Sequence, residues 1–484
     1  MFAPLSKDFY KVGHKEQYPV GTEMIYSNFT ARSGKLSNVK DSKGIYFVGL
    51  QYFVMRKLIE EWNNSFFNKS LHEVIYKYKR IVSTGLGYDV NCDHIEALHD
   101  LGYLPIEIKA LPEGSFVPYG VPMLTIKNTL PDFYWVTNML ETQLSAELWL
   151  PITTATTYKA FQANSLKYSQ LTCDNDLFVP FQNHDFSMRG MQGVDAATLS
   201  GLAFVLAGSN GTDCIPALLA AEDYYGATDF IAGSVNATEH SVMCAGGSDD
   251  EIGTFKRLLT DVYPNGILSV VSDSWDFWKV ITEYLPQLKD TILNRNGKLV
   301  IRPDSGNPVD ILCGTLDVFA NTPEEKGLIH CLWDLFGGKI NNKGYRELDS
   351  HIGAIYGDSI TLERQDEILS RLAESGFASN NVVFGVGSYT LGYVTRDAHG
   401  MAMKSTYAVV NGKGRVLQKD PKTDSGSKKS AKGLLMISQE HGDYVLNENI
   451  DVKQEQYGCL ETVFKDGTLI KKVSFYEVRD TINA

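Results

Sequence analysis

The segment KLVIRPDSGNP (298–308) carries an arginine and a carboxylate where a run of apolar residues ends. In an extended chain, residues two apart point to the same side, so Arg302 and Asp304 are predicted to face one common space. The planar guanidinium of arginine matches phosphate oxygens, and a carboxylate accepts hydrogen bonds from sugar hydroxyls or helps to hold Mg²⁺. Taken alone, the segment is equally compatible with a surface ion pair before a turn, which contributes little to the free energy of folding.

Three further segments end an apolar run in a similar way. GILSVVSDSWDFW leads to Asp273, IGAIYGDSITLE leads to Asp358, and NNVVFGVGSYTLG leads to Gly385 and Gly387. A repeated strand, polar turn and helix is typical of a parallel α/β domain, in which functional groups lie where the strands end. We therefore expect Arg302, Asp304 and these residues to line one rim and to form a shared polar site. The two glycines would let backbone N–H groups approach a phosphate.

Cations and carboxylates at this rim indicate a phosphorylated sugar as the ligand. Arg189 in HDFSMRG and Arg396 in VTRDAHG are further candidates for binding phosphate, and residues 404–432 hold eight Lys or Arg but only two Asp. That basic stretch is compatible either with a solvated loop or with binding of a compact polyanion such as di- or triphosphate. The chain contains no P-loop, no G-x-G-x-x-G after a strand and no Ser-His-Asp or H-E-x-x-H signature. The residues alone predict an α/β enzyme that acts on a phosphorylated sugar.

Two side chains near these segments have a chemical and a plain structural interpretation. His240 in SVNATEHSVM is the histidine that stands out as a candidate, but it is also compatible with a histidine at a helix start that bonds a backbone carbonyl. Phe186 is likewise compatible with a plain place in the core. The residues alone leave these alternatives open.

The length of 484 residues exceeds what one hydrophobic core usually supports, so two domains are expected. We predict a mixed α+β domain from residues 1–150 and 400–484, which contributes to a dimer interface, and a barrel-like α/β catalytic domain from 151–399. Alternating apolar residues in LPIEIKALPEGSFVPYGVPMLTIKN predict antiparallel strands. Residues 133–172 are predicted to be helical, with a break at Pro151.

Bulk composition disfavours several classes of protein. The net charge of −13 disfavours nucleic acid as the main partner. The seven cysteines stand singly without a C-x-x-C pair, and the N-terminus shows no apolar signal segment. No uninterrupted run of about 18 apolar residues occurs. We expect a cytoplasmic protein with reduced thiols and without a membrane partner.

A series of sequence blocks resembles one known family. The blocks run from SKDFYKVGHKEQYP, VGLQYF and LPIEIKALPEG through HDFSMRG, GTD, EHS and VVSDS to IRPDSGNP, GD and TRD. In this order they resemble the nicotinamide phosphoribosyltransferase family of type II phosphoribosyltransferases. The resemblance implies an incomplete (β/α) barrel with a second mixed α+β domain, and a homodimer with shared active sites. It also implies that nicotinamide mononucleotide and diphosphate form from nicotinamide and phosphoribosyl diphosphate, coupled to ATP hydrolysis, in NAD salvage.

The resemblance implies a binding pocket for the pyridine base. Phe186 would stack on one face of the ring, with Tyr10 of the partner subunit on the other. Asp213 would accept a hydrogen bond from the carboxamide NH₂ and would repel nicotinate. Ser234 would be a further substrate-binding residue, and Asp8 of the partner subunit would help to orient the base.

The resemblance also implies ligands for the ribose and its phosphates. In the same subunit these are Arg189, His240, Asp273, Arg302, Asp304, Gly357, Asp358, Gly387, Ser388 and Arg396. Phosphate ligands from the partner subunit would be Arg32, Lys404, Lys419 and Lys428. His240 would be the residue phosphorylated by ATP, with Arg302 and Asp304 as further catalytic residues. Mg²⁺ would be carried with the diphosphate or ATP, and no residue is assigned as a metal ligand.

Two other functions remain compatible with the sequence. Nicotinate phosphoribosyltransferases share the fold and most phosphate ligands, but Asp213 argues against that activity because two facing carboxylates repel each other. A non-catalytic binding scaffold could lose Arg302, Asp304 or His240 without harm, whereas all three are present here.

Overall fold

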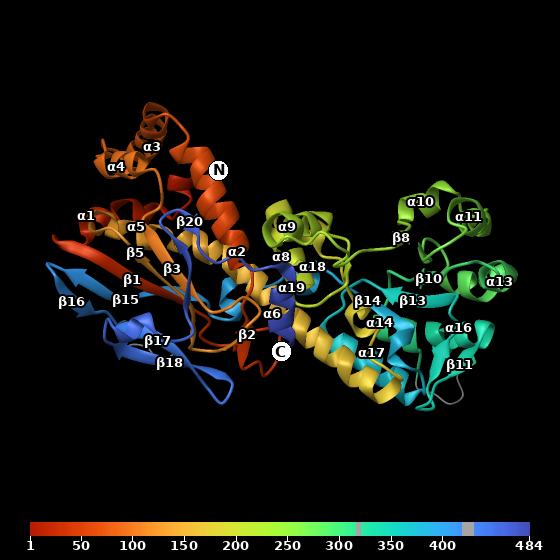
Figure 1. Ribbon diagram of the computed structural model, residues 1–484. Coiled ribbons are helices and arrows are strands. Elements are labelled where there is room, and N and C mark those ends of the chain that lie inside the picture. The colour runs from red at the N-terminus through yellow and green to blue at the C-terminus, as the bar shows by residue number, and fades with distance from the viewer. Residues whose placement is uncertain (316–320, 419–429) are drawn as a thin grey trace. The chain divides into compact units, whose positions relative to one another are not determined.

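The computed structural model describes residues 1–315, 321–418 and 430–484, and the chain divides into two compact units (Figure 1). The first unit comprises Met1–Thr156, Leu219–Thr228 and Val394–Ala484, and the second comprises Thr157–Leu218 and Asp229–Tyr393. The predicted catalytic segment was one uninterrupted stretch, whereas the structure groups residues 219–228 with the first unit. Lys419 and Lys428, both expected to bind phosphate, lie outside the described residues.

A parallel sheet forms the centre of the second unit. Its strands lie in the order β7-β6-β14-β13-β10-β9-β8, and each neighbouring pair is parallel. The strands are β6 (Asn183–Asp185), β7 (Gly211–Thr212), β8 (Asn236–Ala237), β9 (Leu268–Val271), β10 (Leu299–Arg302), β13 (Ile352–Tyr356) and β14 (Val382–Val386). A further bridge joins Gly211 of β7 to Gly233, shortly before β8. Because β8 also pairs with β9, the segment 233–237 draws the two ends of the sheet together, and the predicted barrel-like fold is confirmed.

Helices follow the ends of these strands, as the repeated strand–turn–helix pattern predicts. Asn307 and Thr361 cap two of them by accepting hydrogen bonds from backbone amides of the first turn. The apolar spacing read from the sequence is the buried stripe of α17, which includes Ile368, Leu369 and Leu372. Helices of the second unit include α7 (Val179–Gln182), α8 (Val194–Leu206), α10 (His240–Ala245), α11 (Glu251–Arg257), α12 (Phe277–Lys279), α13 (Leu285–Leu293), α14 (Pro308–Cys313), α15 (Pro323–Lys326), α16 (Leu328–Phe336), α17 (Leu362–Glu374) and α18 (Ser388–Leu391). A hairpin of β11 (Gly338–Ile340) and β12 (Arg346–Leu348) lies beside them.

The first unit is built around an antiparallel sheet of order β16-β15-β1-β5-β3-β19-β20. Its strands are β1 (Thr22–Thr30), β3 (Ile106–Ala110), β5 (Pro122–Asn128), β15 (Ala402–Val410), β16 (Lys413–Val416), β19 (Glu461–Lys465) and β20 (Thr468–Leu469). The predicted antiparallel strands are confirmed, since β3 pairs with β5. Smaller pairs are β2 (Gly44–Tyr46) with β4 (Phe116–Pro118) and β17 (Leu434–Glu440) with β18 (Asp443–Ile450). Helices of this unit include α1 (His14–Gln17), α2 (Leu50–Tyr52), α3 (Leu71–Leu86), α4 (Asp93–Leu101), α5 (Tyr134–Met139) and α19 (Phe475–Asn483).

The helix predicted to break at Pro151 does not break there. α6 runs from Glu141 to Thr172 with this proline inside it. The ring lies against Gly49, where an added Cβ would come within 3.0 Å of it. The Thr153 hydroxyl donates to the carbonyl of Trp149 at 2.7 Å, one turn earlier. Tertiary packing therefore overrides the local tendency of proline to end a helix, and this part of the prediction was wrong.

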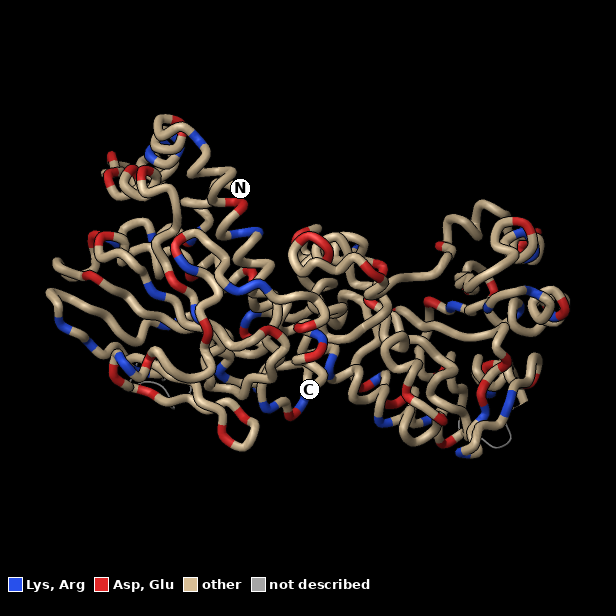
Figure 2. The backbone as a smooth tube through the Cα atoms, viewed as in Figure 1, with Lys and Arg blue, Asp and Glu red and all other residues tan. Residues whose placement is uncertain are grey.

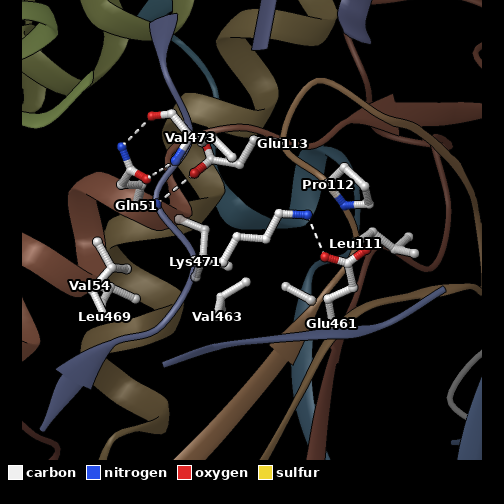
Figure 3. A pocket seen from close by; sticks show the side chains of 12 residues that line it. Gln51, Val54, Leu111, Pro112, Glu113, Glu461, Val463, Leu469, Lys471 and Val473 are labelled. Atoms are coloured by element: carbon white, nitrogen blue, oxygen red, sulfur yellow. Dashed lines mark hydrogen bonds and ion pairs between the residues drawn. The ribbon is translucent and has the colours of Figure 1, made fainter. Parts of the chain in front are cut away.

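A buried polar network explains why residues 219–228 belong to the first unit. The Gln51 carboxamide donates to the carbonyls of Tyr224 at 2.5 Å and Val473 at 2.8 Å, and its oxygen accepts from the Val473 amide at 2.7 Å. Glu113 accepts from the Gln51 amide at 2.6 Å and from the Tyr225 hydroxyl at 3.0 Å. Figure 3 shows Gln51, Glu113 and Val473 meeting beside a small pocket. Four distant chain segments are thus joined by hydrogen bonds, and burial raises the pKa of the Glu113 carboxyl.

Charged residues are dispersed within each unit. Figure 2 shows Lys and Arg interspersed with Asp and Glu along the backbone of both units. Such mixing differs from the continuous basic stripe typical of nucleic-acid-binding proteins. Across the described part of the chain, the helices are too short or too polar to cross a membrane.

Candidate active site

A cavity of about 380 Å³ opens within the barrel of the second unit. Apolar side chains form much of its wall and a few polar groups project among them, as is usual for a small-molecule site. Phe186 supplies an aromatic wall, while Asp213 and Arg302 come from the ends of β7 and β10. Of the residues predicted for the rim, Arg302 lines this cavity.

Asp213 directly follows β7 and is held from several sides. Its backbone amide donates to the carbonyl of Asp185 at 3.0 Å. Its Oδ1 accepts from Ser234 Oγ at 2.6 Å and from His184 Nε2 at 3.0 Å. Burial raises the pKa of the Asp213 carboxyl, but the hydrogen bonds from His184 and Ser234 and the nearby Arg302 charge outweigh it and leave the pKa below its ordinary value. Asp213 is therefore an ionised acceptor in the cavity wall.

Phe186 presents its ring to the cavity and is fixed by its backbone and by two glycines. Its amide donates to the carbonyl of Val386 at 3.0 Å. A Cβ added at Gly385 would lie 2.1 Å from ring atom Cδ2, and a Cβ added at Gly357 would lie 2.7 Å from it. The sequence singled out Gly385 for close approach to a phosphate, but in the structure its missing side chain makes room for Phe186.

His240 and Asp273 form a second cluster of the rim. His240 begins α10, and its Nε2 lies 3.1 Å from Oδ1 of Asp273, the second residue after β9. The other carboxylate oxygen accepts from the Asp304 amide at 3.0 Å and from Ser305 Oγ at 2.6 Å. Burial raises the pKa of Asp273, but the donors from Ser305, Asp304 and His240 reverse this and lower it. The ring of His240 thus bonds a carboxylate and not a backbone carbonyl, and its side chain is 47% exposed.

Arg302 ends β10 and borders the same cavity. Its Nη2 donates to the carbonyl of Thr238 at 2.8 Å, while its buried Nε has no hydrogen-bond partner among the described residues. A buried N–H donor without an acceptor is unfavourable. An anionic ligand that accepts a hydrogen bond from Nε would therefore bind favourably here. The strand ends at Arg302, and Asp304 lies in the following loop, where Asp273 holds its amide.

Other predicted residues of the second unit surround the neighbouring strand ends. Asp358 follows β13 in an exposed loop and accepts from Ser359 Oγ at 3.0 Å. Gly387 precedes α18, which begins at Ser388. Ser388 packs against Gly190, where an added Cβ would lie 1.8 Å from the Ser388 Oγ. The exposed Arg189 belongs to the short 3₁₀ turn Met188–Gly190, so it lies next in sequence to this contact.

Five predicted ligands belong to the first unit. Tyr10 is 64% exposed, and Asp8 accepts a hydrogen bond from Thr142 at 2.5 Å. Arg32 donates from Nε to the Gly400 carbonyl at 2.7 Å, which leaves its terminal nitrogens for other partners. The remaining two residues, Lys404 and Arg396, lie in β15 and in the short turn Arg396–Ala398.

The donor set of the second unit does not form a metal site by itself. Within the described ranges, no group of three or more His, Cys, Asp or Glu side chains is arranged to hold an ion. Asp273 already uses both carboxylate oxygens. Asp304 and Asp358 offer single carboxylates at neighbouring strand ends. This arrangement suits Mg²⁺ that is bound mainly by substrate phosphates and water.

Sequence reasoning missed His184. It lies two residues before Phe186, and strand alternation places both on the same face. The two rings are 5.0 Å apart with an interplanar angle of 64°. The period of two residues within HDFSMRG, which begins with His184, could have identified this histidine as a pocket residue beside Phe186.

The curled parallel sheet, with the candidate site residues at its strand ends, has the fold of the type II phosphoribosyltransferases. A solved structure of nicotinate-nucleotide pyrophosphorylase from Pyrococcus furiosus aligns with a TM-score of 0.60 and 15% identity, covering 99% of this chain and 94% of that chain. The human nicotinic acid phosphoribosyltransferase structure aligns with a TM-score of 0.60 and 14% identity, covering 98% and 92%. At these identities the likeness concerns the fold.

Sequence comparison narrows the class further. Residues 181–467 match the nicotinate phosphoribosyltransferase (NAPRTase) family, and residues 3–108 match the nicotinamide phosphoribosyltransferase N-terminal domain. The chain is 49% identical to nicotinamide phosphoribosyltransferase of Acinetobacter baylyi, covering 98% of this chain and 96% of the relative. It is 35% identical to the protein of the same name from Mycoplasma pneumoniae, covering 87% and 92%. The chain belongs to the nicotinamide phosphoribosyltransferase family, and the resemblance seen in the sequence blocks is confirmed.

Proposed function

We propose that this chain is an enzyme that transfers the ribosyl phosphate of phosphoribosyl diphosphate to nicotinamide, in NAD salvage. The observation that carries the proposal is the ionised Asp213 in a cavity wall beside the ring of Phe186. A carboxamide can donate a hydrogen bond to such a carboxylate, whereas the carboxylate of nicotinate would be repelled. The names of the curated relatives support the same activity.

The transfer is a substitution at C1 of the ribose. The pyridine nitrogen forms a bond to C1 while the bond from C1 to the diphosphate oxygen breaks, and the electron pair leaves with diphosphate. Phe186 orients the base, Arg302 and Arg189 stabilise the leaving charge, and Asp304 and Asp358 accept hydrogen bonds from ribose hydroxyls. Mg²⁺ bound with the diphosphate would add positive charge at the leaving group.

His240 is the proposed phosphoryl acceptor from ATP. Donation from Nε2 to Asp273 leaves Nδ1 as the nucleophilic nitrogen of the neutral ring. A bond forms from Nδ1 to the γ-phosphorus, and the bond to the ADP oxygen breaks. The half-exposed ring is compatible with access of a nucleotide. The phosphorylated ring would bring negative charge next to the diphosphate–Mg²⁺ group and tighten its binding.

The proposed working form is a homodimer with shared sites in the cytoplasm. Tyr10, Asp8, Arg32 and Lys404 would enter the active site of the partner subunit. The exposed ring of Tyr10 and the terminal nitrogens of Arg32, which its bond to Gly400 leaves for other partners, support this assignment. The seven free cysteines are consistent with a reducing compartment.

The test is product formation from phosphoribosyl diphosphate with nicotinamide or nicotinate, each with and without ATP. We expect mononucleotide from nicotinamide and stimulation by ATP. Turnover of nicotinate instead would favour a nicotinate phosphoribosyltransferase, the name of the family that residues 181–467 match. Absence of turnover with both bases would favour a binding scaffold.

A substitution at Asp213 tests the base pocket directly. In Asp213→Asn we expect the KM for nicotinamide to rise about 10- to 100-fold, because a charge-assisted hydrogen bond contributes roughly 1.5–3 kcal/mol. Turnover of nicotinate should rise at the same time. Asp290→Asn, an exposed carboxylate on α13, is the matched control and should leave both bases unaffected. An unchanged preference for nicotinamide over nicotinate in Asp213→Asn would show that Asp213 does not select the base.

A further inference from the structure

His184 takes no part in the transfer chemistry described above, yet it contacts the carboxylate assigned to the base. Its side chain is 12% exposed, and its Nε2 lies 3.0 Å from Asp213 Oδ1. The ring has little room to turn, because a Cβ added at the paired Gly211 would lie 2.5 Å from Nδ1. The edge of Phe186 packs against it on another side.

The two carboxylate oxygens of Asp213 are not equivalent. Oδ1 accepts from both His184 and Ser234, whereas Oδ2 accepts no hydrogen bond from any residue that the structure describes. The backbone of Asp213 is itself anchored to β6. A carboxylate held in this way has one rotamer and keeps one oxygen for a ligand.

We propose that His184 is a positioning residue for Asp213, which fixes the orientation of the carboxylate and thereby sets the preference for a carboxamide over a carboxylate on the base. The inference rests on the proposed function and names a residue that makes the same site selective for nicotinamide. Because Asp213 accepts, Nε2 carries the hydrogen of this contact, and the carboxylate keeps its negative charge toward the base. That charge attracts the amide NH₂ and repels nicotinate.

Ser234 alone cannot supply this orientation. A hydroxyl rotates about its bond and can donate in several directions, whereas the imidazole edge is fixed by the packing of its ring. Ser234 also lies on the segment that joins β7 to β8 by a single bridge at Gly233, while His184 is part of β6, which pairs on both sides. The histidine is thus the more rigid of the two donors.

The test compares two substitutions of similar size. His184→Gln keeps a donor that reaches the carboxylate, and His184→Met fills the space without one. We expect the KM for nicotinamide to rise about tenfold in His184→Met, with kcat changed less than about threefold, because this variant loses the hydrogen bond that orients the acceptor. The ratio of kcat/KM for nicotinamide over nicotinate should fall by a similar factor. His184→Gln should retain most of both values.

A matched control lies in the same unit at the opposite ends of the strands. His351 pairs with Asp349 at 2.7 Å just before β13, and neither residue lines the cavity, so His351→Met removes a similar contact and should leave KM unchanged. If the unsubstituted enzyme uses nicotinamide but His184→Met keeps its KM and its preference, the positioning role is wrong and the proposed function stands. The role is equally wrong if Gln and Met raise KM by the same amount. If the unsubstituted enzyme does not use nicotinamide, the proposed function fails and this inference fails with it.

Discussion

Two aspartates at the barrel rim differ in the partners of their oxygens, and this difference separates their roles. Asp213 keeps Oδ2 for a ligand, whereas Asp273 uses Oδ1 for His240 and Oδ2 for the Asp304 amide and Ser305. Asp273 was singled out as a substrate-binding residue. With both oxygens occupied, we expect it to act through His240 by fixing the ring and the nitrogen that carries hydrogen.

The residue-scale prediction concerns His240. In His240→Asn we expect ATP to lose its stimulating effect, while a slower basal transfer from phosphoribosyl diphosphate remains, because the ring is proposed to receive phosphate but not to contact C1. The measurement is incorporation of labelled phosphate from γ-labelled ATP into acid-labile protein-bound form. His351→Asn is the control and should label as the unsubstituted protein does. Label retained in His240→Asn would place the phosphoryl acceptor elsewhere.

At the scale of elements, the strand ends were the predictable part of the site. Short apolar runs followed by a charged turn placed Asp273, Arg302 and Asp358 at one rim, because parallel strands bring their carboxyl ends to one edge. The roles of Asp213 and Phe186 came from family resemblance, since neither pattern nor spacing shows which ligand a pocket receives. Pro151 was misread because its ring packs against a glycine about a hundred residues earlier.

The sequence singled out the glycines at one strand end, but the structure gives a different reason for a glycine at position 385. Gly385 precedes a polar turn, which suggested contact of its backbone with phosphate. In the structure the ring of Phe186, about two hundred residues earlier in the chain, fills the space beside it. A contact between two distant strands leaves no local signal in the sequence.

The element-scale prediction tests that packing. Gly385→Ala would place a methyl group 2.1 Å from the Phe186 ring and 2.8 Å from the Gly357 Cα, so ring and strand must shift. We expect a destabilisation of about 1–3 kcal/mol and a higher KM for nicotinamide, because overpacking displaces the stacking residue. The measurements are thermal unfolding and steady-state kinetics.

The control for stability lies two residues further along. A Cβ at Gly387 would meet its nearest neighbour at 3.9 Å, so Gly387→Ala should retain the melting temperature of the unsubstituted protein. Equal melting temperatures of the two variants would contradict the packing argument.

At the scale of the whole molecule, the predicted site is divided between residues of the two units. Phe186 and Asp213 belong to the second unit, whereas Tyr10 and Asp8 belong to the first. In a twofold dimer with shared sites, each active site combines one unit of each subunit, so both sites need both chains.

Mixed dimers test this arrangement. Tyr10→Ala and Phe186→Ala should each be poorly active alone. After mixing and exchange of subunits, the proposed arrangement restores roughly a quarter of normal activity, because half of the dimers are mixed and each has one site with both rings. If Tyr10 serves its own subunit, no mixed dimer has an intact site and activity stays low. Each variant mixed with itself is the control for the exchange step.

The pairing of β1 with β15 sets the order of events during protein synthesis. Thr22 near the start of the chain pairs with Val410, and β3 pairs with β19 beyond residue 460. A ribosome adds about 5–20 residues per second, so the edge of β1 that pairs with β15 waits on the order of 20–80 s, whereas its other edge pairs with β5 much earlier. During that interval the barrel strands can assemble first, while the early strands expose unpaired edges that attract chaperones or other nascent chains. Slow decoding of the last hundred codons would therefore lengthen the most aggregation-prone period in the life of this protein.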